Sequence, residues 1–306
     1  MFKLEEATIT SIQTAIAVGE ISYRELVLQY LERIAAVDSC KGGLNSVLEI
    51  NPDALELARL ADDDRAKGMP SGPKGPLYGI PIMLKDNICT SDRMHTSAGS
   101  LALADNYPMM DAEIARGLRE SGAIILGKVN MTEFANWMTK DMPNGYSSRG
   151  GRVKNPYNAE ADPYGSSTGS AVAVSANLCV ASVGTETHGS IISPSFSNGI
   201  VGIKPTAGLL SGFGIVPISS TLETPGPMAR TVYDAAVMLG ALKSAYPSGH
   251  LNAYVFANGM YPGQAKEDYT VHFASSSLKG LRVGVYGKEG EDTEFNEILG
   301  AALETL

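Results

Sequence analysis

Two glycine turns rich in hydroxyl groups lie within one stretch of the chain, residues 164–206. The first reads GSSTGS and the second GTETHGSI, and mostly small apolar residues separate them. Glycine lets one backbone segment approach another closely, and a serine hydroxyl becomes a nucleophile once a base activates it. We therefore predict that this stretch carries the chemistry of the protein.

The first turn contains the pattern G-x-S-x-G at residues 165–169. In α/β-hydrolases this pattern presents a nucleophilic serine, here Ser167, on a sharp turn that follows a strand. The preceding residues, NPYNAEADPY, include two prolines and indicate a loop. The histidines later in the chain also lack an evident acidic partner, so the sequence disfavours a Ser-His-Asp hydrolase.

A second route to a serine nucleophile needs no histidine. A buried lysine can act as the base when burial lowers its pKa enough to leave the amine neutral. Lys85 ends the apolar run in YGIPIMLKDN and best fits this role. The pattern S-x-x-K also occurs at Ser276 and Lys279, but in a polar segment without the other motifs of penicillin-binding enzymes, so we attribute that match to chance.

Four motifs, YGIPIMLKDN, YGSSTGS, GTETHGSI and VGIKPT, occur in this order and resemble those of the amidase signature family of serine hydrolases. The resemblance is strong over residues 77–242 and weaker elsewhere. It implies an α/β fold with a large mixed β-sheet covered by α-helices on both faces. It also implies hydrolysis of carboxamides through an acyl-enzyme, with no metal and no organic cofactor.

The resemblance assigns roles to individual residues. The base is Lys85, the bridging serine that follows a cis peptide bond in the family is Ser166, and the nucleophile is Ser190. The two serines are separated by 24 positions (190 minus 166), which is typical of the motif. The other residues assigned are the main-chain donors of the oxyanion hole, Thr187, His188, Gly189 and Ser190, and two supporting hydroxyls, Ser167 and Ser170.

These roles agree with the chemistry of the residue types. Ser166 would pass the proton of Ser190 to neutral Lys85 and later deliver a proton to the departing amine. Main-chain N–H groups beside the nucleophile can stabilise a tetrahedral oxyanion, and each donor is typically worth about 3 kcal/mol in the transition state.

Two positions depart from the family pattern. His188 stands where glycine or aspartate is common, which alters the polarity beside the substrate. Ile192 stands where many members have arginine two residues after the nucleophile. The missing guanidinium disfavours binding of a carboxylate there and favours a neutral or peptide-like amide, so we expect a small-molecule or peptide-like amide substrate.

Composition excludes several other classes of protein. The net charge of −9 and the pI of about 5.0 disfavour a nucleic-acid-binding surface. The histidines and cysteines show no metal-type spacing, which predicts no metal site. No secretory signal or membrane-spanning run is evident. We therefore expect a cytoplasmic protein with reduced thiols, no membrane association, and a homodimer as the assembly to consider.

The segments around the motifs alternate between helical and extended patterns. Helices are predicted at residues 8–18, 52–67, 111–120, 170–178, 231–242 and 292–306, from a capping box of Ser22 with Glu25, and from about Asn130; strands are predicted at residues 45–50, 78–87, 123–128, 180–184 and 281–286. This alternation indicates a layered α/β architecture.

We expect a single amidase signature domain over residues 1–306. It would comprise N-terminal helices (1–66), a catalytic core (75–242) and an incomplete C-terminal part (243–306), because family members are commonly longer than this chain. The leading hypothesis is an amidase that releases ammonia or an amine. The alternatives are an amidotransferase component that generates ammonia for a tRNA-bound partner, or an inactive truncated remnant.

Overall fold

The computed structural model describes residues 2–68, 75–243 and 293–305, with a few isolated residues between 268 and 284. The chain divides into two units, Met1–Tyr269 and Thr270–Leu306. Every residue to which the sequence assigns a catalytic role belongs to the first unit. In the second unit, helix α9 spans Thr293–Thr305 and confirms the helix predicted at 292–306. The strand predicted at 281–286 lies outside the described residues.

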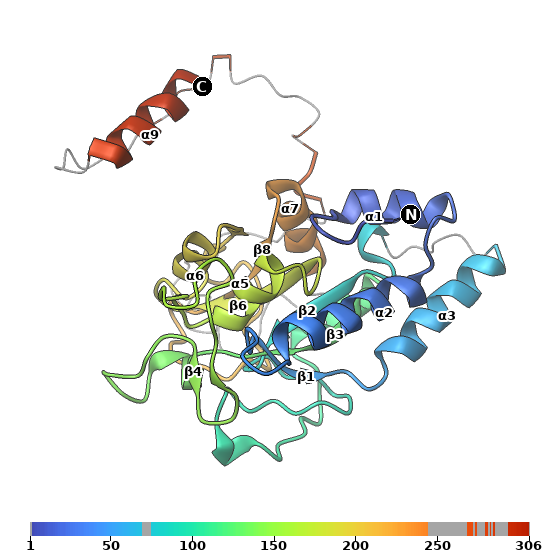
Figure 1. Ribbon diagram of the computed structural model, residues 1–306, viewed down its shortest axis with the longest axis horizontal. Helices are drawn as coiled ribbons and strands as arrows, with labels where there is room; N and C mark the ends of the chain where they lie inside the picture. Colours follow the sequence, from blue (N-terminus) through green and yellow to red (C-terminus); the bar gives the residue numbers. More distant parts are fainter. Residues whose placement is uncertain are drawn as a thin grey trace. The chain divides into compact units, whose positions relative to one another are not determined.

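A six-stranded mixed sheet forms the centre of the first unit (Figure 1). Its strand order is β1-β3-β2-β6-β8-β7, in which β2 runs parallel to both β3 and β6 while β1, β8 and β7 pair antiparallel. A two-stranded hairpin, β4-β5, lies apart from this sheet. The strands are β1 (Val47–Ile50), β2 (Pro81–Lys85), β3 (Ile124–Val129), β4 (Tyr146–Ser147), β5 (Gly151–Arg152), β6 (Ala181–Glu186), β7 (Val201–Gly202) and β8 (Thr224–Ala229).

Helices flank this sheet, which confirms the predicted α/β class. Helix α5 contacts β2, β3, β6 and β8, whereas α7 contacts β6, β7, β8 and α4. Helix α2 packs on α3, which in turn contacts β3. The helices of the first unit are α1 (Ile9–Ala17), α2 (Tyr23–Arg33), α3 (Ala54–Ala66), α4 (Glu113–Glu120), α5 (Thr168–Ser175), α6 (Ile192–Ser197) and α7 (Val232–Ala241).

The parallel pairing of β2 with β6 brings the predicted base and nucleophile to the same end of the sheet, where both strands have their carboxyl ends. In α/β proteins, ligands bind in the crevice outside the carboxyl ends of such strands. Strand β2 ends at Lys85, and β6 ends at Glu186, four residues before Ser190. Every residue of both strands is buried, so Lys85 and Glu186 lie within the core at the ends of these strands.

Residues 130–136 do not form the helix predicted to begin near Asn130. Their main-chain groups bond to other segments instead. The N–H of Asn130 donates to the Ser46 carbonyl and its carbonyl accepts the N–H of Gly169, while the N–H of Thr132 donates to the Ser166 carbonyl. Only a short 3-10 turn follows at Glu133–Asn136. Tertiary hydrogen bonds have therefore replaced the local ones that a helix would need, and they hold the segment against the serine turn.

Strand β8 was missed because its sequence, TPGPMA, contains two prolines. The carbonyl of Pro227 accepts from the N–H of Ile203, so this residue faces β7. Backbone groups alternate in direction along an antiparallel strand, so Pro225 faces the same side. Strand β7 is only two residues long and pairs with Met228 and Ala229. The missing N–H groups therefore face the short strand β7 and leave the ladder between β6 and β8 intact, which is a condition under which proline is tolerated in a strand.

The capping box predicted at the start of α2 is confirmed. The Ser22 hydroxyl accepts from the main chain of Glu25 at 3.1 Å, and the Glu25 carboxylate accepts from the main chain of Ser22 at 2.8 Å. Two N–H groups that the helix itself cannot satisfy are thereby paired.

We expect Ser22→Ala to lower the free energy of unfolding by about 1 kcal/mol, the usual cost of losing such a cap. Thr10→Ala is the matched control, because Thr10 is an exposed residue of α1 whose side chain makes no hydrogen bond among the described residues. Urea unfolding of the three proteins measures the difference. Equal stabilities of Ser22→Ala and the parent would contradict a stabilising cap.

Candidate active site

Lys85 is completely buried at the end of β2. Its Nζ donates to Ser166 Oγ at 2.8 Å, to Thr185 Oγ1 at 3.0 Å and to the Thr185 carbonyl at 3.1 Å. These three oxygens fix an otherwise flexible side chain in one position. The predicted base and the predicted bridging serine are therefore in direct contact, although 81 positions separate them.

Burial lowers the pKa of Lys85 to about 7, because the surroundings cannot solvate an ammonium ion. The negative charges of Glu223 and Glu186 oppose this effect and raise the pKa. Burial also raises the pKa of Glu223, which accepts the N–H of Ile218 at 2.6 Å. An amine with a pKa near neutrality can both accept and return a proton, as a general base must.

Ser166 lies just before α5 and is 1 % exposed. The peptide bond between Gly165 and Ser166 is cis. The Ser166 carbonyl accepts the N–H of Thr132 at 3.1 Å, and the Thr168 hydroxyl donates to the carbonyl of Tyr164 at 2.6 Å. The turn is thus held on both sides of the bridging serine.

Ser167 and Ser170 bond to the backbone of β6. The Ser167 hydroxyl donates to the Thr185 carbonyl at 3.0 Å and accepts the Thr185 N–H at 3.1 Å. The Ser170 hydroxyl donates to the carbonyl of Val183 at 3.2 Å. Both side chains therefore fasten α5 to the strand, which agrees with supporting roles and leaves Ser167 unsuited to be a nucleophile.

The loop that carries Ser190 closes around the carboxylate of Glu186, which is 4 % exposed. This carboxylate accepts the main-chain N–H groups of Gly189 at 2.7 Å, Ile191 at 2.7 Å and Ile192 at 2.9 Å. Hydrogen bonds to an ionised acceptor are stronger than neutral ones. Sequence reasoning did not assign Glu186 a role, although an acidic residue four positions before the nucleophile was visible in GTETHGSI.

Ser190 is 9 % exposed, and its carbonyl accepts the N–H of Ser167 at 3.0 Å. This backbone bond brings the two serine turns together. Within residues 75–243 the hydroxyls of Ser166 and Ser190 make no direct hydrogen bond to each other. A substrate would therefore meet Ser190 with its hydroxyl still available.

The predicted oxyanion donors divide into two groups. The N–H of Gly189 is already bonded to Glu186. The N–H groups of Thr187, His188 and Ser190 have no hydrogen-bond acceptor within residues 75–243. The geometry thus leaves these three groups available to a developing negative charge, and the exposed side chain of His188 does not obstruct the main chain.

A second fully buried lysine, Lys128, lies on the neighbouring strand β3. Its Nζ donates to the Ile88 carbonyl and to Thr96 Oγ1, each at 2.6 Å. Burial lowers its pKa to about 8. These contacts lead away from the serine turns, so Lys128 stabilises the segment after β2. The sequence ILGKV hinted at such a lysine but did not indicate its partners.

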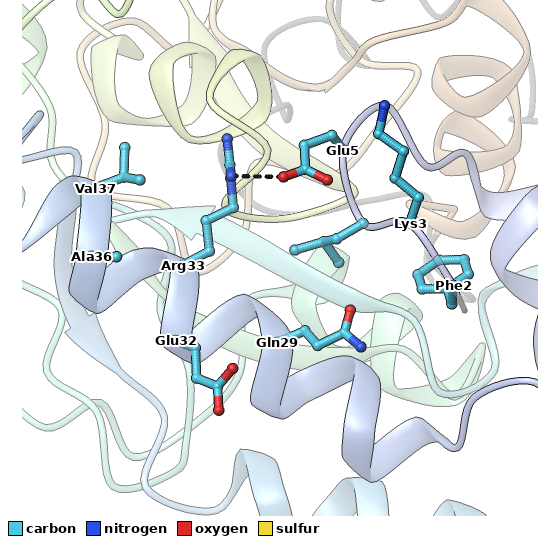
Figure 2. Close-up of a pocket in the computed structure, with 9 residues that line it drawn as sticks. Phe2, Lys3, Glu5, Gln29, Glu32, Arg33, Ala36 and Val37 are labelled. Carbon is cyan, nitrogen blue, oxygen red and sulfur yellow. Dashed lines mark hydrogen bonds and ion pairs between the residues drawn. The ribbon is translucent and has the colours of Figure 1, made fainter.

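A hollow with a volume of about 610 Å³ lies between the N-terminal segment and α2 (Figure 2). Arg33 reaches across it to Glu5, with an Nη1–Oε1 distance of 3.2 Å. The lining residues are Phe2, Lys3, Leu4, Glu5, Gln29, Glu32, Arg33, Ala36 and Val37. None of the predicted catalytic residues lines this hollow.

Two further properties concern only the part of the chain that the structure describes. No helix there combines the length and the apolar character needed to cross a bilayer. No group of three or more His, Cys, Asp or Glu side chains is placed there so that it could hold a metal ion.

Comparison with known proteins gives a consistent result. A profile of the Amidase family matches residues 25–306. The chain is 42% identical to a probable amidase of Arabidopsis thaliana over 94% of its own length and 54% of that protein. It is 37% identical to a glutamyl-tRNA(Gln) amidotransferase component of Halorhodospira halophila, over 99% of this chain and 59% of that one.

Among solved structures, the native peptide amidase from Stenotrophomonas maltophilia matches with a TM-score of 0.81 and 46% identity, over 89% of this chain and 54% of that one. The chain therefore spans slightly more than half the length of the relatives it matches. With the family profile covering nearly all of the sequence, the chain belongs to the amidase signature family.

Proposed function

We propose that this protein hydrolyses the C–N bond of a carboxamide through an acyl-enzyme on Ser190. The observation that carries the proposal is the buried contact between Lys85 Nζ and Ser166 Oγ at 2.8 Å. Such a contact makes the serine hydroxyl a proton carrier between an amine of lowered pKa and a nucleophile.

In each half of the reaction a proton moves to Lys85 through Ser166 during the attack and returns through Ser166 when the intermediate collapses. In acylation, Ser166 gives its proton to Lys85 and takes that of Ser190, while Ser190 Oγ attacks the amide carbonyl. The free N–H groups of the 187–190 loop stabilise the resulting oxyanion. The intermediate collapses when the C–N bond breaks and the nitrogen leaves with a proton delivered through Ser166. Water then repeats the attack and releases the acid.

The substrate that fits best is a neutral or peptide-like amide. Ile192, which is 47 % exposed beside the nucleophile, offers apolar surface and no charge for a substrate carboxylate. The likeness to a peptide amidase at 46% identity supports the same class. Peptide C-terminal amides and small primary amides are the compounds to test first.

A second candidate is the ammonia-generating component of an amidotransferase, supported by relatives that carry the amidotransferase name. The identity to the peptide amidase structure is higher than the identity to these relatives, which favours the stand-alone hydrolase. A third candidate is an inactive remnant. Ammonia release by the purified protein without a partner separates the first candidate from the other two.

We expect Ser190→Ala and Lys85→Met each to lower ammonia release from a primary amide by at least about 10³-fold, because a linked nucleophile and base fail together. Ser175→Ala is the control, since this serine of α5 donates to Tyr157 and lies outside the relay. An enzyme-coupled ammonia assay measures all four proteins. Undiminished turnover by Ser190→Ala would refute the proposed mechanism, and failure of an acyl-reactive probe to label folded parent protein would favour the remnant.

Activity should depend on pH through Lys85. Its pKa of about 7 means that the neutral amine predominates above that pH and the ammonium ion below it. Because only the neutral amine can accept the proton of Ser166, kcat/KM should fall about tenfold per pH unit below the pKa and level off above it. Initial rates between about pH 5 and 9 test this expectation. A profile that is flat across pH 7 would contradict a lysine base.

Glu186→Gln tests the carboxylate that closes the nucleophile loop. The amide replaces one acceptor oxygen by a donor, so at least one of its N–H bonds is lost, and kcat should fall by about 10²-fold, as for loss of one oxyanion group. Removing the negative charge also lowers the pKa of Lys85, so the fall in rate on the acidic side of the pH–rate profile, its acidic limb, moves to lower pH. Glu186→Asp, which keeps the charge, should leave that limb in place. An unmoved limb in Glu186→Gln would exclude the electrostatic effect.

A further inference from the structure

Asn87 lies two residues beyond the end of β2 and is 1 % exposed. In this orientation of the amide its Nδ2 donates to Thr185 Oγ1 at 2.9 Å, and its main-chain carbonyl accepts the N–H of Val216 at 2.8 Å. Its Oδ1 is buried and has no hydrogen-bond partner within the described residues. A buried acceptor without a partner is costly and calls for an explanation.

The number of hydrogen atoms that Lys85 can donate suggests an explanation for the unpaired oxygen of Asn87. An ammonium ion has three N–H groups, which match the three oxygens that Nζ contacts. The neutral amine has only two N–H groups and a lone pair. The Thr185 carbonyl can only accept, so one of the two hydroxyls must accept the second N–H while the other donates its proton to the lone pair.

Catalysis requires that the donor be Ser166. If Thr185 instead directed its hydroxyl hydrogen at Lys85, the lone pair would be occupied and Ser166 could not be deprotonated. Thr185 is 1 % exposed, so bulk solvent does not reach its hydroxyl. Asn87 is the other side chain within hydrogen-bonding distance of that hydroxyl.

An asparagine amide carries an acceptor and a donor on the same carbon, and a half-turn of its last side-chain bond exchanges them. With Oδ1 facing Thr185, the amide accepts the hydroxyl hydrogen, and Oδ1 gains the partner that it otherwise lacks. Nδ2 then takes the former place of Oδ1. The Thr185 oxygen is left able only to accept from Lys85.

We propose that Asn87 is a positioning residue of the active site, whose amide holds the hydroxyl of Thr185 so that the lone pair of Lys85 stays directed at Ser166. This role rests on the proposed function, because it matters only if Lys85 acts as a base. Asn87, just beyond β2, and Thr185, in β6, would then act together to orient the proposed base.

A double-mutant cycle tests whether Asn87 acts through Thr185. Asn87→Leu and Thr185→Val should each lower kcat about tenfold or more with little change in KM, as part of the roughly 10²–10⁴-fold that acid–base catalysis supplies. The double variant should be no slower than Thr185→Val alone. Its acidic limb should coincide with that of Thr185→Val, which lies at lower pH than the parent's because the ammonium ion has lost an acceptor.

Two further variants separate this role from simple packing. Asn51→Leu is the matched control, because Asn51 is a buried asparagine that bonds the Ile125 carbonyl away from Lys85. Asn51→Leu should lower the thermal midpoint without shifting the pH–rate profile. Any loss of kcat that it causes should multiply with the loss caused by Thr185→Val. Asn87→Asp keeps an acceptor for the Thr185 hydrogen, so its rate at the alkaline plateau should exceed that of Asn87→Leu.

Multiplicative losses in the double variant, or a plateau for Asn87→Asp below that of Asn87→Leu, would overturn the inference. So would parent-like kinetics of Asn87→Leu. The last result, combined with an inactive Ser190→Ala, would leave the proposed amidase intact and remove only the role of Asn87.

Discussion

The contact between Lys85 and Ser166 depends on the absence of water. An amine in solution would be charged at neutral pH and useless as a base, whereas this amine is enclosed at the end of an entirely buried strand and has a pKa of about 7. Strand β2 must therefore be covered on both faces and flanked on both edges. Strands β3 and β6 flank its two edges and helix α5 packs against it, and every residue of the strand is buried. The fold thus meets the condition that the proposed chemistry sets.

Two opposing influences set the pKa of Lys85, because burial lowers it and nearby negative charges raise it. These charges are the carboxylates of Glu186 and Glu223, and both come from segments that the sheet places next to the base. Glu186 has a second effect, because its oxygens collect three N–H groups around the nucleophile. One buried charge thus influences the proposed base Lys85 electrostatically and positions the loop of the proposed nucleophile Ser190.

Every group in the proposed relay comes from residues 85–190, within the first unit of the chain. The base comes from one strand, the bridging serine from the turn before α5, and the nucleophile from the loop after β6. The chain matches only slightly more than half of the length of its relatives. The three side chains of the proposed relay, Lys85, Ser166 and Ser190, all lie in the part that these relatives share with this chain.

The sequence by itself determined the family and the residues with the most recognisable surroundings. Lys85 stood out because a lysine rarely ends an apolar run. Ser166 and Ser190 stood out because their glycine turns have the 24-residue separation that is typical of the family motif. Local patterns such as the capping box of Ser22 and Glu25 were equally legible, since each depends on residues within one helical turn.

Tertiary structure alone decided which groups surround those residues. The contacts of Lys85 with Thr185, and of Thr185 with Asn87, join positions about 100 residues apart through the pairing of β2 with β6. The prolines of β8 were acceptable only because β7 is short, and the main chain after Asn130 left the helical path only because other segments bind it. No local pattern records such partners, because each depends on where distant backbone groups lie once the sheet has formed.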